Sequence, residues 1–277
     1  MQMLTALILG IVQGLTEFLP VSSTAHLVLL PWAFGWDDPL LNSLTFDVAL
    51  HFGTLVAVLI YFRADWLKLA AAFFQTLKNR RAAAPYERLA WLIIIATIPG
   101  AILGKLFGQY IEDALRNPLV IAVALAGVAL VMLLAEKAAK SKNGAGTEEM
   151  TLPHALVIGF AQAAALIPGV SRSGATITAG LITGYDRASA ARFSFLLSTP
   201  IIAGACLLKL RHFVHGFPEG EAGPFAVGAL ASAVSGYAAI AFLMGYLSRR
   251  PLNVFAYYRI VLAAAVVGLY MVGSASL

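Results

Sequence analysis

The chain has 277 residues, of which 60% are hydrophobic and only 12% are charged, with a net charge of +5. This composition, with a mean hydropathy of +0.83, excludes an ordinary soluble domain and predicts an all-α polytopic membrane protein. The basic residues lie in short stretches between apolar runs, without interleaved aromatic residues, so nucleic acid is not an expected partner.

Six apolar segments are long enough to cross a bilayer, which takes about 20 residues. They are residues 46–62, 89–107, 119–135, 193–210, 225–247 and 255–272. When each segment counts as one crossing, every strongly basic connection falls on the same side, as expected for the cytoplasmic face. The connection 63–88 is therefore predicted to be a cytoplasmic loop.

Two further apolar stretches, 3–31 and 153–183, are unsuited to crossing because polar residues interrupt each of them. Pro20 breaks the first stretch, and Pro168 with Gly169 breaks the second. Irregular backbone at membrane depth is tolerated only inside the protein or along a cavity. Each stretch is thus predicted to form a re-entrant helical hairpin whose break lies in the protein interior.

The two hairpins carry the same sequence features at a constant offset of 149 residues: Gly10, Gln13, Val21 and Ser22 match Gly159, Gln162, Val170 and Ser171. We therefore divide the chain into a first repeat (1–136), a cytoplasmic linker (137–152) and a second repeat (153–277). Each repeat holds one hairpin and three spans, and an odd number of crossings inverts the second repeat. Inverted repeats with broken helices typically form a ligand site near the membrane midplane.

The first hairpin concentrates polar side chains that are costly in a membrane and mark function there. Gln13 and Glu17 share one helix face, and Ser22 and Ser23 precede His26 by four and three residues. Free amides at the start of the second helix favour an anion. Two alternatives are structural: a serine that caps the helix, and a histidine that is buried and hydrogen-bonded.

The second hairpin has the features of a phosphate site. Arg172 lies between Ser171 and Ser173, and Thr176 follows one turn later. A guanidinium and hydroxyl donors suit phosphate oxygens. Here the structural alternatives are an arginine that snorkels and a threonine that bonds to its own helix. Because Glu17 would repel phosphate, it is expected to act as an acid or base or through a divalent cation.

The remaining polar residues of the spans are expected to have structural roles and no catalytic or binding role. Asp47 is read as a helix cap or an interfacial residue, and Cys206 as a small core residue. Four histidines, His51, His154, His212 and His215, have no metal-ligand partners at a fixed spacing.

Together the two motifs resemble the signatures of the bacitracin-resistance type undecaprenyl-diphosphate phosphatases. The first reads Gln13-x-x-x-Glu17-x-x-Pro20-Val21-Ser22-Ser23-Thr24-x-His26, and the second Pro168-Gly169-Val170-Ser171-Arg172-Ser173-Gly174-Ala175-Thr176. The resemblance extends over the whole chain in length, span count and duplication. It implies hydrolysis of undecaprenyl diphosphate to the monophosphate, which recycles the lipid carrier of peptidoglycan synthesis and confers bacitracin resistance. It also implies a bacterial plasma-membrane location with the active site facing the periplasm.

The resemblance also assigns roles to the residues. Glu17, Ser23 and His26 would react, and Ser171, Arg172, Ser173 and Thr176 would hold the diphosphate. From the residues themselves, we also count Arg172 among the catalytic groups, and Gln13 and Ser22 among the substrate-binding groups. The family admits Glu or Gln at the position of Gln13. Because this chain has glutamine there, Glu17 is the only carboxylate of the pair. A magnesium or calcium ion would therefore be held by Glu17 and Gln13 with the substrate's own oxygens.

Two mechanisms stay open at this point. Ser23 would attack phosphorus while His26 or Glu17 accepts its proton, or Glu17 would activate a water molecule instead. The Ser-Arg-x5-His-x3-Asp motif of other lipid phosphatases is not met, because position 178 is Thr. The rival function is a transporter or flippase of an anionic polyprenyl phosphate lipid, and a homodimer is admitted by either function.

Overall fold

The computed structural model describes residues 2–41, 43–139, 144–214 and 222–275, and its regular elements there are helices. The first half contains α1 (Gln2–Phe18), α2 (Ser23–Phe34), α3 (Leu44–Tyr61), α4 (Arg63–Asn79), α5 (Pro85–Leu115) and α6 (Pro118–Ala138). The second half contains a 3-10 turn η1 (Thr147–Glu149), α7 (Leu152–Ala164), α8 (Arg172–Ile182), α9 (Arg187–Val214), α10 (Ala222–Leu247) and α11 (Asn253–Ala275).

The protein is a polytopic membrane protein. Among the described residues, the helices α5, α6, α9, α10 and α11 are each long and apolar enough to cross a bilayer. A sixth crossing results if α3 and α4 are counted as one span, although they meet at a bend of 80°. Large apolar side chains such as Val123, Leu208 and Val261 are exposed on these helices, as expected for surfaces that face lipid.

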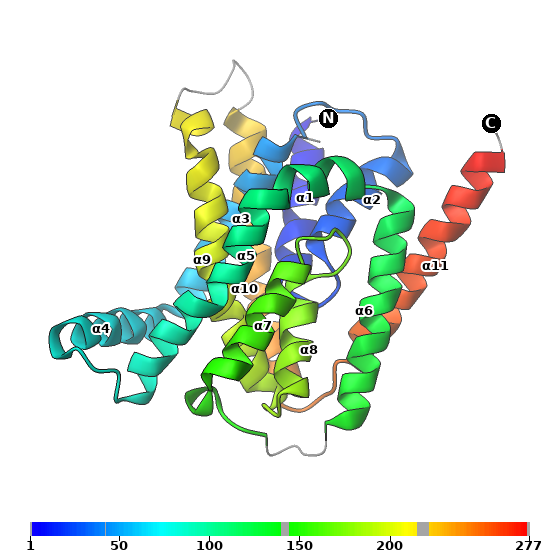
Figure 1. Ribbon diagram of the computed structural model, residues 1–277. Coiled ribbons are helices and arrows are strands. Elements are labelled where there is room, and N and C mark those ends of the chain that lie inside the picture. Colours follow the sequence, from blue (N-terminus) through cyan, green and yellow to red (C-terminus); the bar gives the residue numbers. More distant parts are fainter. Residues whose placement is uncertain (1, 42, 140–143, 215–221, 276–277) are drawn as a thin grey trace.

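The connection after α3 differs from the sequence-based expectation. Residues 63–79 form α4 and not a loop, and α4 projects sideways from the bundle (Figure 1). Its hydrophobic face buries Leu69 and Ala72, while its polar face remains exposed. An amphipathic helix of this kind suits a membrane interface. From the sequence, we had used only the basic residues of this segment, which place it on the cytoplasmic side.

Both predicted helix breaks are confirmed. α1 ends at Phe18 and α2 begins at Ser23, whereas α7 ends at Ala164 and α8 begins at Arg172. The residues just before α2 and α8 are Ser22 and Ser171, with φ of 76° and 70°. Non-glycine residues rarely adopt this left-handed conformation, which often marks functional sites. Each serine caps its helix, accepting a hydrogen bond from the amide of Ala25 or Gly174.

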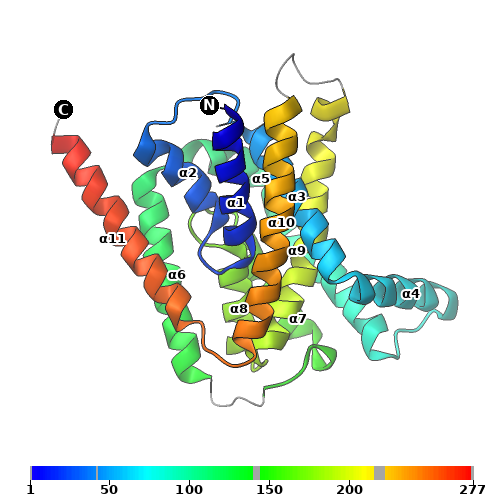
Figure 2. The same ribbon diagram turned by 180° about the vertical axis from the view of Figure 1, so that it is seen from behind.

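The first helix of each hairpin packs against the opposite half of the chain. α1 lies along α10, and α7 lies along α5 (Figure 2). A Cβ atom on Gly10 would come within 2.4 Å of the Gly228 carbonyl oxygen, and one on Gly159 would come equally close to that of Ala96. The two glycines at matched positions therefore permit two equivalent close helix contacts.

Arg259 of α11 holds both breaks in place. Its side chain is fully buried and donates to the carbonyl oxygens of Pro20 at 3.3 Å, Gly169 at 2.8 Å and Val170 at 3.1 Å. It also donates to the carbonyls of Leu125 and Ala124 in α6. The carbonyls of Pro20, Gly169 and Val170 lie where helices are interrupted, so a buried cation satisfies acceptors that have no partner in a helix.

We predict that Arg259→Met destabilises the protein by about 3 kcal/mol or more, because several buried carbonyl groups lose their donor. Thermal unfolding in detergent measures the change. The control is Arg249→Met, at an exposed position. Equal stability of the two variants would contradict this role of Arg259.

Candidate active site

The two hairpins touch through an ion pair. Arg172, the first residue of α8, donates from Nη2 to Oε1 of Glu17 in the last turn of α1. A second contact joins the same two breaks, since Ser173 Oγ donates to the carbonyl oxygen of Leu19 at 3.0 Å. Residues that the sequence predicted for one site from two separate motifs are thus brought together.

The other carboxylate oxygen of Glu17 organises the first hairpin. Oε2 accepts from Ser23 Oγ at 2.6 Å and from Gln13 Nε2 at 3.0 Å. Gln13 reaches it because i and i+4 share a helix face. Ser23 reaches it because the left-handed backbone at Ser22 turns the chain sharply before α2 begins. A hydroxyl bonded to a carboxylate is the arrangement of a nucleophile with its base.

His51 of α3 belongs to the same cluster, although the sequence placed it among the ordinary histidines. Its Nε2 lies 3.5 Å from Glu17 Oε2, and its Nδ1 donates to the carbonyl oxygen of Asp47 at 2.7 Å. In a neutral ring whose Nδ1 carries the proton, Nε2 would point a lone pair at the carboxylate of Glu17. The contact is therefore attractive only when Nε2 also carries a proton. The missed signal was a lone ionisable residue inside an apolar span.

A cavity of 240 Å³ lies beside the ion pair. Its polar wall combines both hairpins with one neighbouring helix: Glu17, Ser22, Ser23, His51, Gln162, Ser171 and Arg172. The rest of the lining is mainly apolar and includes Leu166 and Ile202. Charged and hydroxyl groups in a small cavity with apolar walls act on a bound anion more strongly than they would in water.

Gln162 faces this cavity with an amide that has no protein partner. It is 3% exposed, and neither Oε1 nor Nε2 makes a hydrogen bond within the described part of the chain. Its counterpart at the offset of 149, Gln13, likewise leaves Oε1 unpaired. Buried polar groups are nearly always satisfied, so these atoms are suited to a polar ligand.

The hydrogen bonds of His26 go to Ser22 and Tyr258, and its catalytic role stays a prediction. Its Nδ1 donates to the carbonyl oxygen of Ser22, and its Nε2 hydrogen-bonds the hydroxyl of Tyr258 of α11, both at 2.7 Å. The two rings also stack, with an interplanar angle of 10°. The spacing of His26 from Ser22 returns the ring to its own helix backbone, so Glu17 and not His26 is the group that bonds Ser23.

The hydroxyls of the second motif are used mainly within the protein. Thr176 donates to the carbonyl oxygen of Arg172 at 2.7 Å and pairs with Ser194 Oγ at 2.6 Å. Ser173 holds the first break, as described above, and Ser171 caps α8 while lining the cavity. Substrate contacts of Thr176 and Ser173 stay a prediction, whereas their structural contacts are observed.

The comparison with known proteins places the chain in a family. Residues 6–265 match the family model described as "Bacitracin resistance protein BacA". The chain belongs to this family. Related proteins named undecaprenyl-diphosphatase occur in Rubrobacter xylanophilus (50% identical; 98% of this chain and 99% of the relative covered) and Thermodesulfovibrio yellowstonii (49%; 97% and 98%). A third relative with this name, from Pelobacter propionicus, is 46% identical over 99% of both chains.

The protein's own donors fit a divalent cation only in part. Within the described ranges, no three His, Cys, Asp or Glu side chains come together as a ligand group. One carboxylate, that of Glu17, lies beside the unpaired amide oxygen of Gln13. Magnesium commonly binds one or two carboxylates together with substrate phosphates, so this BacA-family site suits a cation that arrives with its substrate.

We predict strong coupling between Glu17 and Arg172. Glu17→Gln or Arg172→Met alone leaves a largely buried charge without its partner and costs about 3 kcal/mol of stability. The double variant should cost less than the sum of the two. Thermal unfolding of the four proteins of this double-mutant cycle measures the difference. Simple additivity would show that the pair does not join the hairpins.

Proposed function

We propose that this protein hydrolyses undecaprenyl diphosphate to undecaprenyl phosphate and phosphate, and so recycles the lipid carrier of peptidoglycan synthesis and confers bacitracin resistance. The observation that carries the proposal is the arrangement of Ser23, Glu17 and Arg172 where the two helix breaks meet. The names of its relatives and the family description agree with this activity.

The proposed architecture is an inverted repeat of six spans and two re-entrant hairpins, with repeats 1–136 and 153–277 and a linker 137–152. Residues 140–143 of that linker lie outside the described residues. Support comes from the exchanged contacts of α1 with α10 and of α7 with α5. The left-handed serines at an offset of 149 residues support it as well.

In the proposed reaction, Ser23 Oγ forms a bond to the terminal phosphorus while the bond from phosphorus to the bridging oxygen breaks. Undecaprenyl phosphate leaves, and Glu17 Oε2 takes the serine proton over the existing 2.6 Å hydrogen bond. Water then attacks the phosphoserine, and Ser23 regains its proton as phosphate is released. Covalent catalysis of this kind divides one difficult displacement into two easier steps.

Arg172 links substrate binding to activation of the serine. In the free protein its guanidinium is paired with Glu17. Diphosphate oxygens compete for the same donors, and a carboxylate that has lost its cation accepts a proton more readily. Arg172 would then stabilise charge on the transferring phosphoryl group. The same cation thus restrains the base until an anion enters the cavity.

The other side chains have supporting roles in this proposal. Gln13 orients Glu17, and Gln162 offers its unpaired amide to a phosphate oxygen. Ser171 and Ser22 present capped helix N-termini to the anion. His26, paired with Tyr258, positions the start of α2.

A divalent cation, magnesium or calcium, belongs to the proposal as a companion of the substrate. When bound, it would neutralise charge on the diphosphate. Glu17 and Oε1 of Gln13 would hold it on the protein side, together with oxygens of the substrate.

We also propose the bacterial plasma membrane as the location, with the site open to the periplasmic side. The C-terminal end of α6 and the connection from α10 to α11 lie at the end of the bundle opposite to the N-terminus of α1 (Figure 1). These segments contain Lys137, Arg249 and Arg250, which support this orientation. Basic residues favour the cytoplasmic face, which places the opposite end outside.

The decisive assay incubates detergent-purified protein with undecaprenyl diphosphate and measures free phosphate, with and without a chelator. We predict release that falls on chelation, and a loss of about a thousandfold in kcat for Arg172→Ala. Arg249→Ala, at an exposed position, is the control. A transporter or flippase, which the broken helices would also suit, would release no phosphate, and near-full activity of Arg172→Ala would contradict the assigned role.

A further inference from the structure

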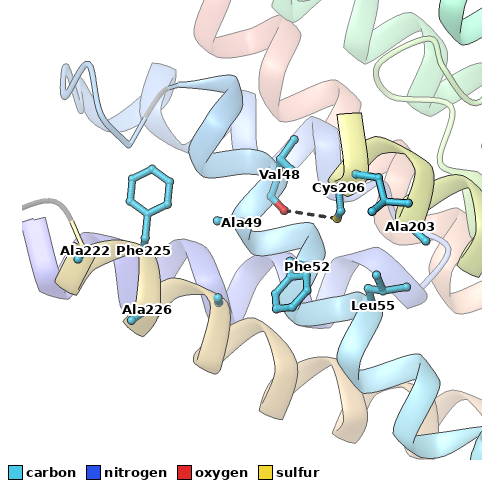
Figure 3. Close-up of a pocket in the computed structure, with 11 residues that line it drawn as sticks. Val48, Ala49, Phe52, Leu55, Ala203, Cys206, Ala222, Phe225 and Ala226 are labelled. Atoms are coloured by element: carbon cyan, nitrogen blue, oxygen red, sulfur yellow. Dashed lines mark hydrogen bonds between the residues drawn. The ribbon is translucent and has the colours of Figure 1, made fainter. Parts of the chain in front are cut away.

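A large apolar groove lies between α3, α9 and α10 (Figure 3). Its volume is 550 Å³, and its eleven lining residues include no charged side chain. Five of them are alanines, which leave space between the helices, and larger side chains such as Phe52, Leu207 and Phe225 border that space. A groove of this size and lining suits an apolar ligand.

The groove adjoins the polar cavity along the contact between α3 and α9. On α3, His51 lines the cavity while its neighbours Val48 and Phe52 line the groove. On α9, Ile202 lines the cavity and Cys206 the groove. The Cys206 thiol contacts the carbonyl oxygen of Val48 at 3.9 Å, as Figure 3 shows.

We propose that this α3–α9–α10 groove binds the polyprenyl chain of the lipid diphosphate whose head group occupies the polar cavity. The inference rests on the proposed function and adds a chain-binding site to it. A diphosphate held by Arg172 must direct its attached chain out of the cavity, and the groove begins on the next residues of the same two helices.

The position of the groove agrees with this occupant. Ala222, Phe225 and Ala226 line it at the start of α10, at the end of the bundle where α1 also begins (Figure 1). Leu55 and Ala229 line it one to two turns deeper. The groove therefore extends along the half of the bundle that the proposed topology places in the outer leaflet, where a lipid chain would lie next to the cavity.

The test fills the groove without altering the polar cavity. Ala226 is exposed and lines the groove, so Ala226→Phe adds bulk there. Ala238→Phe is the matched control, because Ala238 is exposed on the same helix but does not line the groove. Phosphate release from undecaprenyl diphosphate is compared with release from farnesyl diphosphate, whose short chain reaches less of the groove.

We expect Ala226→Phe to lower the ratio of kcat/KM for the long-chain over the short-chain substrate about tenfold, mainly through KM, since chain methylenes lose contact. Ala238→Phe should leave the ratio unchanged. An unchanged ratio for Ala226→Phe overturns the proposal. So does a change of oligomeric state without a change in the ratio, because it would assign the groove to a second copy of the chain.

A direct binding measurement separates this inference from the proposed function. In the Cys206→Ala background, Ala226→Cys carries a single thiol, and its alkylation by N-ethylmaleimide is followed with and without undecaprenyl phosphate. Protection by undecaprenyl phosphate but not by an equal amount of phosphatidylglycerol supports the groove even if no phosphate is ever released. Equal alkylation under both conditions overturns it, and equal protection by both lipids assigns the groove to ordinary bilayer lipid.

Discussion

The ion pair between Glu17 and Arg172 joins the two helix breaks. Two charges within an apolar protein are tolerated only when each has a partner. Here each charge comes from a different helix break, so the two breaks must meet. Arg259 then binds the carbonyl groups that the breaks expose, and Ser173 adds a direct bond between them. The contacts that form the site thus also stabilise the bundle.

The sequence predicted the parts of the fold that membrane physics dictates. Span lengths follow from the bilayer thickness, and the breaks follow from Pro20 and Pro168-Gly169 within apolar stretches. Glu17 and Arg172 were identifiable because ionisable groups in such stretches are rare, and because each lies within a motif whose other residues repeat at the offset of 149. The positive φ of Ser22 and Ser171 shows that the repeated motif adopts the same backbone conformation before α2 and before α8.

The residues of the site that the sequence did not predict are brought to it by tertiary packing. His51, Arg259 and Tyr258 are isolated residues on distant spans, and no local spacing connects them with either hairpin. Arg259 bonds backbone carbonyls, which carry no sequence signal at all. Conversely, His26 was grouped with Glu17 by spacing, but its helix turns the ring toward Tyr258. Spacing identified the elements that meet, whereas the direction of each side chain required the packed structure.

A crystal structure with orthovanadate, which adopts the geometry of a phosphoryl group in transfer, would show how Ser23, Glu17 and Arg172 act together. We expect vanadium bonded to Ser23 Oγ, with the guanidinium of Arg172 on its equatorial oxygens and no longer on Glu17. Vanadate bound away from both hairpins, or bound while Arg172 still pairs with Glu17, would contradict this expectation.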